Sequence, residues 1–118
     1  MAPPEILNVL AEMVVTDHAS GVEWYTALFG RPPDRRPMEG LAEWQLNPTG
    51  GLQVFERSEG AGSCVATLVV DTVTPVTEHL TSIGIETEMQ TVSSGFAIAS
   101  VRDPDGNAIT FAGSREEA

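Results

Sequence analysis

The stretch VRDPDGNAITF, residues 101–111, has the composition of two strands joined by a tight turn. Asp103 suits the first turn position, Pro104 presets φ for the second, and Gly106 accepts the left-handed backbone that ends the turn. The flanking segments FAIASV and NAITFA are short, apolar and broken by small residues, which is typical of hairpin strands. The sequence therefore predicts a β-hairpin whose returning strand carries Thr110.

The turn occurs twice, because NPTGG before one strand matches DPDGN before another. The elements around the two turns follow the same order of strand, helix and three strands. In the first half we predict a strand at 5–15, a helix from Thr16 or Asp17 to Gly30, a short strand near Met38, and strands at 41–46 and 52–57. In the second half we predict a strand at 64–70, a helix capped by Thr72 or Thr74 with Pro75 in its first turn and ending at Gly84, and strands near 86–92, 96–102 and 107–113.

This duplication predicts an α+β fold built from two tandem βαβββ modules, 5–58 and 64–114, within one domain that spans 1–118. The Gly/Ser-rich SEGAGS at 58–63 connects them. Each sheet packs one face against its helix and leaves the other face concave. We therefore expect a curved mixed-sheet cup with helices on its outer face, and a loop over RPPDRRP at 31–37.

The charge balance of the 118 residues narrows the class of partner. The chain has 17 acidic residues against six basic ones, all six arginine, and a net charge of -11. Such a field repels phosphate backbones and anionic lipid, so we expect neither nucleic acid nor membrane partners. The single cysteine, Cys64, cannot form an internal disulfide, and no charged-then-apolar leader opens the chain. A cytoplasmic protein is the simplest interpretation.

The duplicated module, the segment VVTDHASGVEWYTALFG and the closing VRDPDGNAITF resemble the vicinal oxygen chelate superfamily. This superfamily includes glyoxalase I, extradiol dioxygenases and bleomycin-resistance proteins. The resemblance covers nearly the entire chain, and the D-P-D-G-N turn is its most specific element. It implies a glyoxalase-like fold, frequent pairing into homodimers, and, in the enzymes of the group, a divalent metal held in the cup.

The metal-ligand positions that the resemblance implies carry few donors in this sequence. The first-strand ligand, seven residues before Asp17, falls on Leu10, and its counterpart in the second module falls on Val65. The final carboxylate of the family pattern aligns with Thr110, and the remaining ligand falls on Gln53, or on Val54 if the register differs by one. Because metals need imidazole, thiolate or several oxygen ligands, we expect no metal and no other cofactor. A displaced metal at Glu12, Gln53 and a neighbour stays an alternative.

Glu12 is the most distinctive candidate for the cup, because an acid within an apolar strand shares a face with Leu10. There it would suit general acid/base work or pairing with a bound cation. An ion pair with Arg57 or Arg102 is the structural alternative. Trp44 and Phe55 would form an aromatic wall for a planar ligand, or else pack in the core. The predicted ligand-binding set is Leu10, Glu12, Trp44, Gln53, Phe55, Val65, Thr67 and Thr110, and no catalytic residue is assigned beyond the weak candidate Glu12.

The remaining reactive side chains have simpler interpretations. His18 stands at a helix start, and His79 lies on a helix away from the cup. Cys64 begins a strand, where a small buried apolar residue is the usual role. The arginines of RPPDRRP would contact a carboxylate ligand if the loop were a lid, although a solvated loop is the stronger interpretation.

These observations predict a metal-free small-molecule-binding protein of the glyoxalase/bleomycin-resistance type, which forms a homodimer and sequesters a cationic or aromatic compound such as an antibiotic. The alternative is an enzyme, a lyase, isomerase or dioxygenase, that uses a displaced divalent metal or Glu12 as base. A third possibility is a purely structural dimer with a collapsed cup. Ligand identity and dimer mode stay open at this point.

Overall fold

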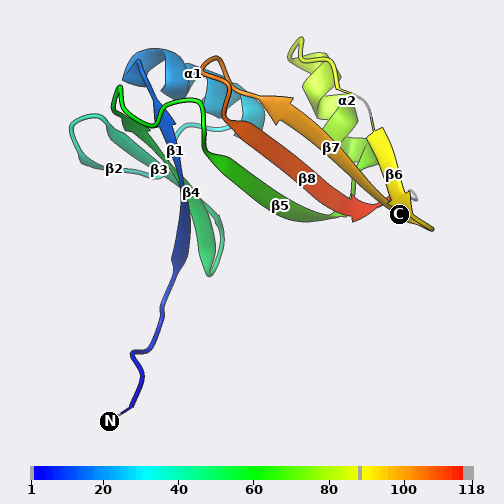
Figure 1. The fold of residues 1–118 in the computed structure, drawn as a ribbon, viewed down its shortest axis with the longest axis horizontal. Helices are drawn as coiled ribbons and strands as arrows, with labels where there is room; N and C mark the ends of the chain where they lie inside the picture. The colour runs from blue at the N-terminus through cyan, green and yellow to red at the C-terminus, as the bar shows by residue number, and fades with distance from the viewer. Residues whose placement is uncertain (1, 88, 116–118) are drawn as a thin grey trace. The chain divides into compact units, whose positions relative to one another are not determined.

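The computed structural model describes residues 2–87 and 89–115, and these residues form two βαβββ repeats (Figure 1). The first repeat comprises β1 (Val9–Val15), α1 (His18–Phe29), β2 (Arg35–Met38), β3 (Leu41–Asn47) and β4 (Gly50–Glu56). The second comprises β5 (Val65–Thr72), α2 (Thr74–Ser82), β6 (Met89–Ser93), β7 (Phe96–Arg102) and β8 (Ala108–Ser114). The predicted duplication is confirmed.

Each repeat builds its own four-stranded mixed sheet, with the order β1-β4-β3-β2 in the first and β5-β8-β7-β6 in the second. The first and last strands of each repeat pair in parallel, and the remaining neighbours are antiparallel. The chain divides into two compact units, Met1–Ala61 and Gly62–Ala118, and the division falls within the predicted connector. We refer to them as unit 1 and unit 2. Across residues 2–87 and 89–115, no helix has the length and apolarity needed to cross a membrane.

Helix α1 begins and ends as its sequence predicts. Asp17 is the N-cap, and its carboxylate accepts a hydrogen bond from the backbone N–H of Ser20 at 2.9 Å. The hydrogen bonds from the Ser20 hydroxyl and backbone lower the pKa of Asp17 below its ordinary value. Gly30 ends the helix in the left-handed conformation with φ of 73°.

The core of unit 1 lies between α1 and one face of its sheet. Gly21 on the helix approaches β1 and β4 so closely that a Cβ there would lie 3.0 Å from Val15 Cγ2 and 3.2 Å from Val54 Cγ1. Fully buried side chains from three strands share this face, namely Met13, Val15, Ala42, Trp44, Leu52 and Val54. The opposite face of the sheet is therefore the one that α1 leaves uncovered.

In unit 2 one part of the core is a cluster of Val73, Ala97 and Ala99, against which the partly buried Val70 and Met89 pack. Its helix α2 has Pro75 in the first turn, as predicted, but the predicted caps are wrong. Val73 occupies the N-cap position and supplies no side-chain hydrogen bond. The first turn is instead closed by backbone bonds from residues 76 and 77 to the Val73 carbonyl.

The D-P-D-G-N turn at 103–107 contains a buried network of hydrogen bonds. The Asp103 carboxylate accepts bonds from the backbone N–H groups of Asp105, Gly106 and Asn107 and from the Asn107 side-chain amide. Asn107 is fully buried, and its Oδ1 accepts the backbone N–H groups of Gly62 and Cys64 at 3.0 and 2.9 Å. The D-P-D-G-N motif therefore fixes the entry into β5 as well as the turn itself.

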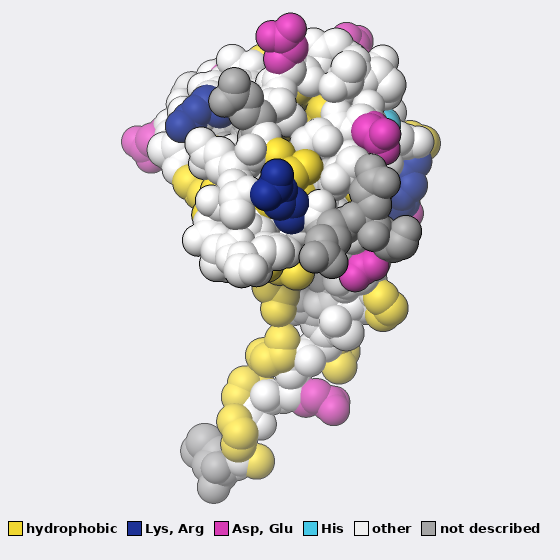
Figure 2. All heavy atoms as spheres, turned by 90° about the vertical axis from the view of Figure 1, so that its right-hand side faces the viewer, with side chains coloured by type: hydrophobic (Ala, Val, Ile, Leu, Met, Phe, Trp, Pro, Cys, Tyr) yellow, Lys and Arg dark blue, Asp and Glu magenta, His cyan; other side chains and the backbone are white. Residues whose placement is uncertain are grey.

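Three predicted boundaries need correction. The first strand begins at Val9 rather than at residue 5, so Ile6 and Leu7 precede it and are exposed; in Figure 2 hydrophobic side chains follow this segment at the lower end of the view. Residues 35–37 of the predicted arginine loop belong to β2, which pairs with β3. The strand predicted near 86–92 is β6 and begins at Met89, while residue 88 lies outside the described residues.

Candidate functional site

Four polar side chains lie side by side across the uncovered face of unit 1. The strand registers pair Glu12 with Gln53, Gln53 with Glu43, and Glu43 with Arg35. Neighbouring strands lie about 4.8 Å apart, so paired residues place their side chains next to each other on one face. We call Glu12, Gln53, Glu43 and Arg35 the polar row.

Glu43 is the centre of the polar row, although it is not in the predicted ligand-binding set. Only 7% of the residue is exposed, and both carboxylate oxygens have partners. Oε2 accepts a 2.6 Å hydrogen bond from Gln53 Nε2, and Oε1 lies 3.1 Å from Arg35 Nη2. This pairing offsets the cost of burying a carboxylate. The signal was present in LAEWQL, because strand alternation places Glu43 on the face opposite to Trp44.

Trp44 does not line the uncovered face, which contradicts its predicted role in the cup. The residue is fully buried on the helix side of the sheet. Its ring centroid lies 5.7 Å from that of Phe29 and 6.2 Å from that of Tyr25, both on α1. Its Nε1–H donates a 2.9 Å hydrogen bond to the Arg31 carbonyl. The alternative interpretation, packing in the core, is the one that the structure supports.

Glu12 shares the uncovered face with Leu10 and Phe55, and it is exposed. Within the described part of the chain its carboxylate makes no hydrogen bond or ion pair. The alternative pairing with Arg57 is absent there, because Arg57 Nε donates to the Glu59 carbonyl at 2.9 Å. Leu10 and Phe55 are partly buried and flank the acid. Glu12 is thus a solvated carboxylate beside apolar side chains.

The uncovered face of unit 2 carries hydroxyl groups where unit 1 carries its polar row. The registers pair Thr67 with Thr110 and Thr110 with Ser100. The Thr110 and Ser100 hydroxyls are 2.8 Å apart and share a hydrogen bond. Val65 lies on this face and is 71% exposed. Of the predicted set, Val65, Thr67 and Thr110 therefore share one face of unit 2, and Leu10, Glu12, Gln53 and Phe55 share one face of unit 1.

The residues at the family's metal positions do not fit a divalent cation. Leu10 and Val65 carry no donor atom, and the Thr110 hydroxyl is bonded to Ser100. Val54, the alternative to Gln53, is buried on the helix side. Within residues 2–87 and 89–115 no three His, Cys, Asp or Glu side chains gather. The displaced site would need a third donor beside Glu12 and Gln53, and both oxygens of the neighbouring Glu43 are already engaged.

The segment before β2 is anchored to β3 rather than open. Arg31 Nη1 contacts both carboxylate oxygens of Asp34 at 2.8 and 2.9 Å, and its Nη2 donates to the Gln45 carbonyl. The backbone N–H of Gln45 in turn donates to Asp34. That hydrogen bond, followed by those from Arg31, lowers the pKa of the Asp34 carboxyl. The Arg31 guanidinium is therefore used in hydrogen bonds within the fold and is not available to bind a ligand.

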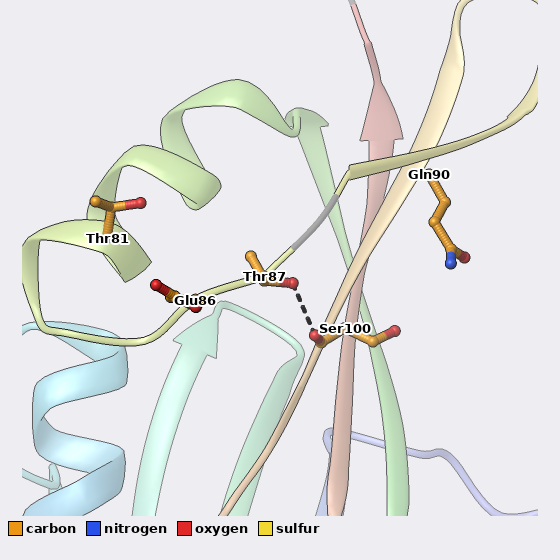
Figure 3. Close-up of a pocket in the computed structure, with 5 residues that line it drawn as sticks. All are labelled: Thr81, Glu86, Thr87, Gln90 and Ser100. Atoms are coloured by element: carbon orange, nitrogen blue, oxygen red, sulfur yellow. Dashed lines mark hydrogen bonds between the residues drawn. The ribbon is translucent and has the colours of Figure 1, made fainter.

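A hollow lies beside each of these faces. The groove in unit 1 has a volume of about 520 Å³ and is lined by Arg35, Arg36, Pro37 and Glu43. The pocket in unit 2 has a volume of about 660 Å³ and is lined by polar residues, Thr81, Glu86, Thr87, Gln90 and Ser100 (Figure 3). In it the Thr87 hydroxyl donates a 2.8 Å bond to the Ser100 carbonyl.

The histidines and the cysteine are not members of the polar row. His18 opens α1, where its backbone N–H donates a 2.8 Å bond to the Glu56 carboxylate, and its Nδ1 is buried without a hydrogen-bond partner. His79 belongs to α2, in unit 2. Cys64 is partly buried at the entry to β5, where Asn107 binds its backbone.

Comparison with known proteins identifies the family. No protein-family model matches the sequence, and a search of curated proteins finds no match. Among solved structures, the bleomycin resistance determinant encoded on transposon Tn5 is 18% identical, covers 91% of this chain and 97% of its own, and has a TM-score of 0.74. Lactoylglutathione lyase from Agrobacterium tumefaciens is 15% identical, with coverages of 95% and 96% and a TM-score of 0.75. At these identities the likeness shows the fold alone.

A glyoxalase/bleomycin resistance protein from Catenulispora acidiphila DSM 44928 is more similar. It is 33% identical over 91% of this chain and 97% of its own, with a TM-score of 0.85. Identity at this level over almost the full length of both chains, together with the two βαβββ repeats and the D-P-D-G-N turn, extends the likeness from fold to family. The chain belongs to the glyoxalase/bleomycin resistance protein family of the vicinal oxygen chelate superfamily.

Proposed function

We propose that the chain binds a small organic molecule on the uncovered face of unit 1 and sequesters it without a metal. The observation that carries the proposal is Glu12, an exposed carboxylate without a partner in the described residues, flanked by the apolar Leu10 and Phe55. A carboxylate beside apolar side chains suits a ligand that combines a positive charge with a planar or aliphatic body.

The rest of the polar row supports this choice of ligand. Glu43 is paired with Arg35 and accepts a hydrogen bond from the Gln53 amide, so within the polar row Glu12 is the acid left to attract a cation. The net charge of -11 adds a long-range attraction for cations. The Tn5 relative is a bleomycin resistance determinant, and bleomycin is a cationic glycopeptide, so an antibiotic of this kind is a reasonable first ligand to test.

The metal-free part of the proposal rests on donor chemistry. Two of the four positions that the family uses are hydrocarbon, and Thr110 shares its hydroxyl with Ser100. Sequestration needs only shape and a few polar contacts. We further propose that the protein works as a homodimer and in the cytoplasm, as the sequence analysis predicts.

A thermal-shift experiment tests the proposal with a matched pair of probes and one drug. Benzamidine is cationic and benzamide is its neutral analogue, so their difference isolates the charge. We expect benzamidine and bleomycin to raise the Tm of the wild-type protein, benzamide to have a smaller effect, and Glu12→Gln to remove the difference between the two probes. Equal effects of benzamidine on the wild type and on Glu12→Gln would contradict the proposal.

A further inference from the structure

The groove on β2 and β3 is lined by two arginine side chains of unit 1 that keep free N–H donors. Three of the six arginines fall within residues 31–36, and the chain has no lysine. The Arg31 guanidinium already donates hydrogen bonds to the Asp34 carboxylate and the Gln45 carbonyl. Arg35 and Arg36 line the groove together with Pro37 and Glu43. The arginines available to a ligand in this part of the fold are therefore the two in the groove.

The two guanidinium groups have donors to spare. The Arg36 side chain makes no hydrogen bond or ion pair with any residue among 2–87 and 89–115. Arg35 contacts Glu43 through Nη2, and its side chain is still 60% exposed, whereas that of Glu43 is 9% exposed. A guanidinium has five N–H donors in a planar fork. The ion pair with Glu43 therefore positions Arg35 through Nη2. The other N–H donors of the Arg35 guanidinium stay available to a ligand in the groove.

The charge of the groove selects a singly charged anion. Arg35 and Arg36 contribute two positive charges and Glu43 one negative charge, so the lining carries a net +1. The protein as a whole carries -11, which repels a dianion more than a monoanion. A planar carboxylate also matches the fork geometry of arginine. Pro37 adds an apolar wall for the body of the ligand.

From these features we infer that the groove lined by Arg35, Arg36, Pro37 and Glu43 is a carboxylate-binding subsite. Arg36 supplies the free guanidinium, and Arg35 is positioned by Glu43. The subsite goes beyond the proposed function, because it does not use Glu12 and takes an anionic rather than a cationic group. The volume of about 520 Å³ is within the range of small-molecule sites.

The test is an NMR titration of ¹⁵N-labelled protein at constant ionic strength with benzoate, and with benzamide as its neutral analogue. We expect benzoate to give saturable shifts of the Arg35 and Arg36 Nε–H signals and of the β2 backbone, with a Kd in the low millimolar range, about 1–10 mM, as for an exposed charge pair. Arg36→Gln should weaken benzoate binding roughly fivefold or more through loss of charge-assisted hydrogen bonds. Arg36→Lys should recover only part of that loss.

The controls separate the groove from general charge effects. Arg57→Gln removes the same charge from a loop outside the groove and should leave benzoate binding unchanged. Shifts that do not saturate, equal shifts with benzamide, or an unchanged Kd in Arg36→Gln would each overturn the subsite. Inorganic phosphate should bind more weakly than benzoate, and tighter phosphate binding would overturn the assignment to carboxylates.

Glu12→Gln distinguishes failure of this inference from failure of the proposed function. The variant should lose the preference for benzamidine and keep benzoate binding, because Glu12 lies at the opposite end of the polar row from Arg35. Loss of benzoate binding in Glu12→Gln would contradict the independence of the two sites.

Discussion

The two repeats use different chemistry at the same place, the entry into their first strand. In unit 2 the backbone N–H of Cys64 is bound by the side chain of Asn107, which is fully buried. In unit 1 the corresponding N–H, that of Val9, donates to the Thr49 carbonyl at 3.3 Å and to the side-chain Oδ1 of the partly buried Asn8 at 3.0 Å. The Asx-Pro-x-Gly turn of unit 2 therefore also fixes the entry into the first strand of its repeat with a buried side chain, whereas the turn of unit 1 contacts that entry through the Thr49 carbonyl.

The uncovered faces differ in the same way. The registers align Glu12, Gln53 and Glu43 of unit 1 with Thr67, Thr110 and Ser100 of unit 2. The first set carries charge and includes a buried acid, whereas the second set carries only hydroxyls. The two repeats therefore share their strand pairing but differ in the polarity of the uncovered face. The charged contacts proposed for a ligand lie in unit 1.

The largest expected effect concerns Trp44, whose counterpart in unit 2 by register is the smaller Val101. Trp44→Ala should lower the free energy of unfolding by about 3–5 kcal/mol, because it leaves a cavity between α1 and β3. Val101→Ala should cost less, since fewer atoms are removed. Urea denaturation followed by circular dichroism measures both. A cost below that of Val101→Ala would contradict the core position of Trp44.

The turn comparison predicts the next largest effect. Asn107→Ala should destabilise the protein by about 2–4 kcal/mol, because it leaves the Gly62 and Cys64 N–H groups and the Asp103 carboxylate without their buried partner. Asn47→Ala, in the exposed turn of unit 1, should cost less than about 1 kcal/mol. The same denaturation measurement applies, and equal costs would show that the two turns do not differ as described.

A smaller effect is expected on the uncovered faces. Glu43→Ala should cost about 1–2 kcal/mol, discounted for the exposure of Arg35, because the Gln53 amide loses its acceptor. Ser100→Ala, its counterpart in unit 2, should cost about 0.5–1 kcal/mol through loss of one exposed hydrogen bond. Thermal unfolding of the two variants tests the ranking, and a larger loss in Ser100→Ala would reverse the comparison.

The smallest effect is a dependence on pH that originates in unit 1. The folded-state pKa values of Asp17 and Asp34 are lowered from 3.8, the first by hydrogen bonds from Ser20 and the second by the Gln45 N–H and Arg31. A lowered pKa contributes stability that is present above 3.8 and is lost as pH falls through the folded-state value. Asp17→Asn and Asp34→Asn should therefore flatten the decline of Tm below pH 4. An unchanged slope in both variants would show that these two carboxylates are not the source of the decline.

Most of the fold followed from local signals. Asp17, Gly30 and Gly106 mark ends and turns through backbone requirements that do not depend on distant residues, and all three occupy the predicted positions. The first strand was predicted four residues too long because Ile6 and Leu7 continue its apolar pattern. Pairing decided the boundary, since β4 begins at Gly50, opposite Val9, and offers no partner further back (Figure 1).

The candidate site was harder to predict because it depends on which face a helix covers. Trp44 and Glu43 are adjacent, so they lie on opposite faces, and the sequence alone does not say which of the two faces α1 covers. The contacts of Tyr25 and Phe29 with Trp44 settle that choice. The burial of Glu43 then depends on Gln53 and Arg35, which are distant along the chain and meet it only through strand register.

The aromatic cluster beneath α1 also provides an optical label for half of the molecule. Both tryptophans, Trp24 and Trp44, and the sole tyrosine, Tyr25, lie in unit 1, and unit 2 contains neither residue type. Intrinsic fluorescence excited at the indole band therefore follows the melting of the first repeat alone, whereas circular dichroism follows both. Comparing the two signals on one unmodified sample reveals whether the duplicated halves unfold as a single cooperative unit or in succession.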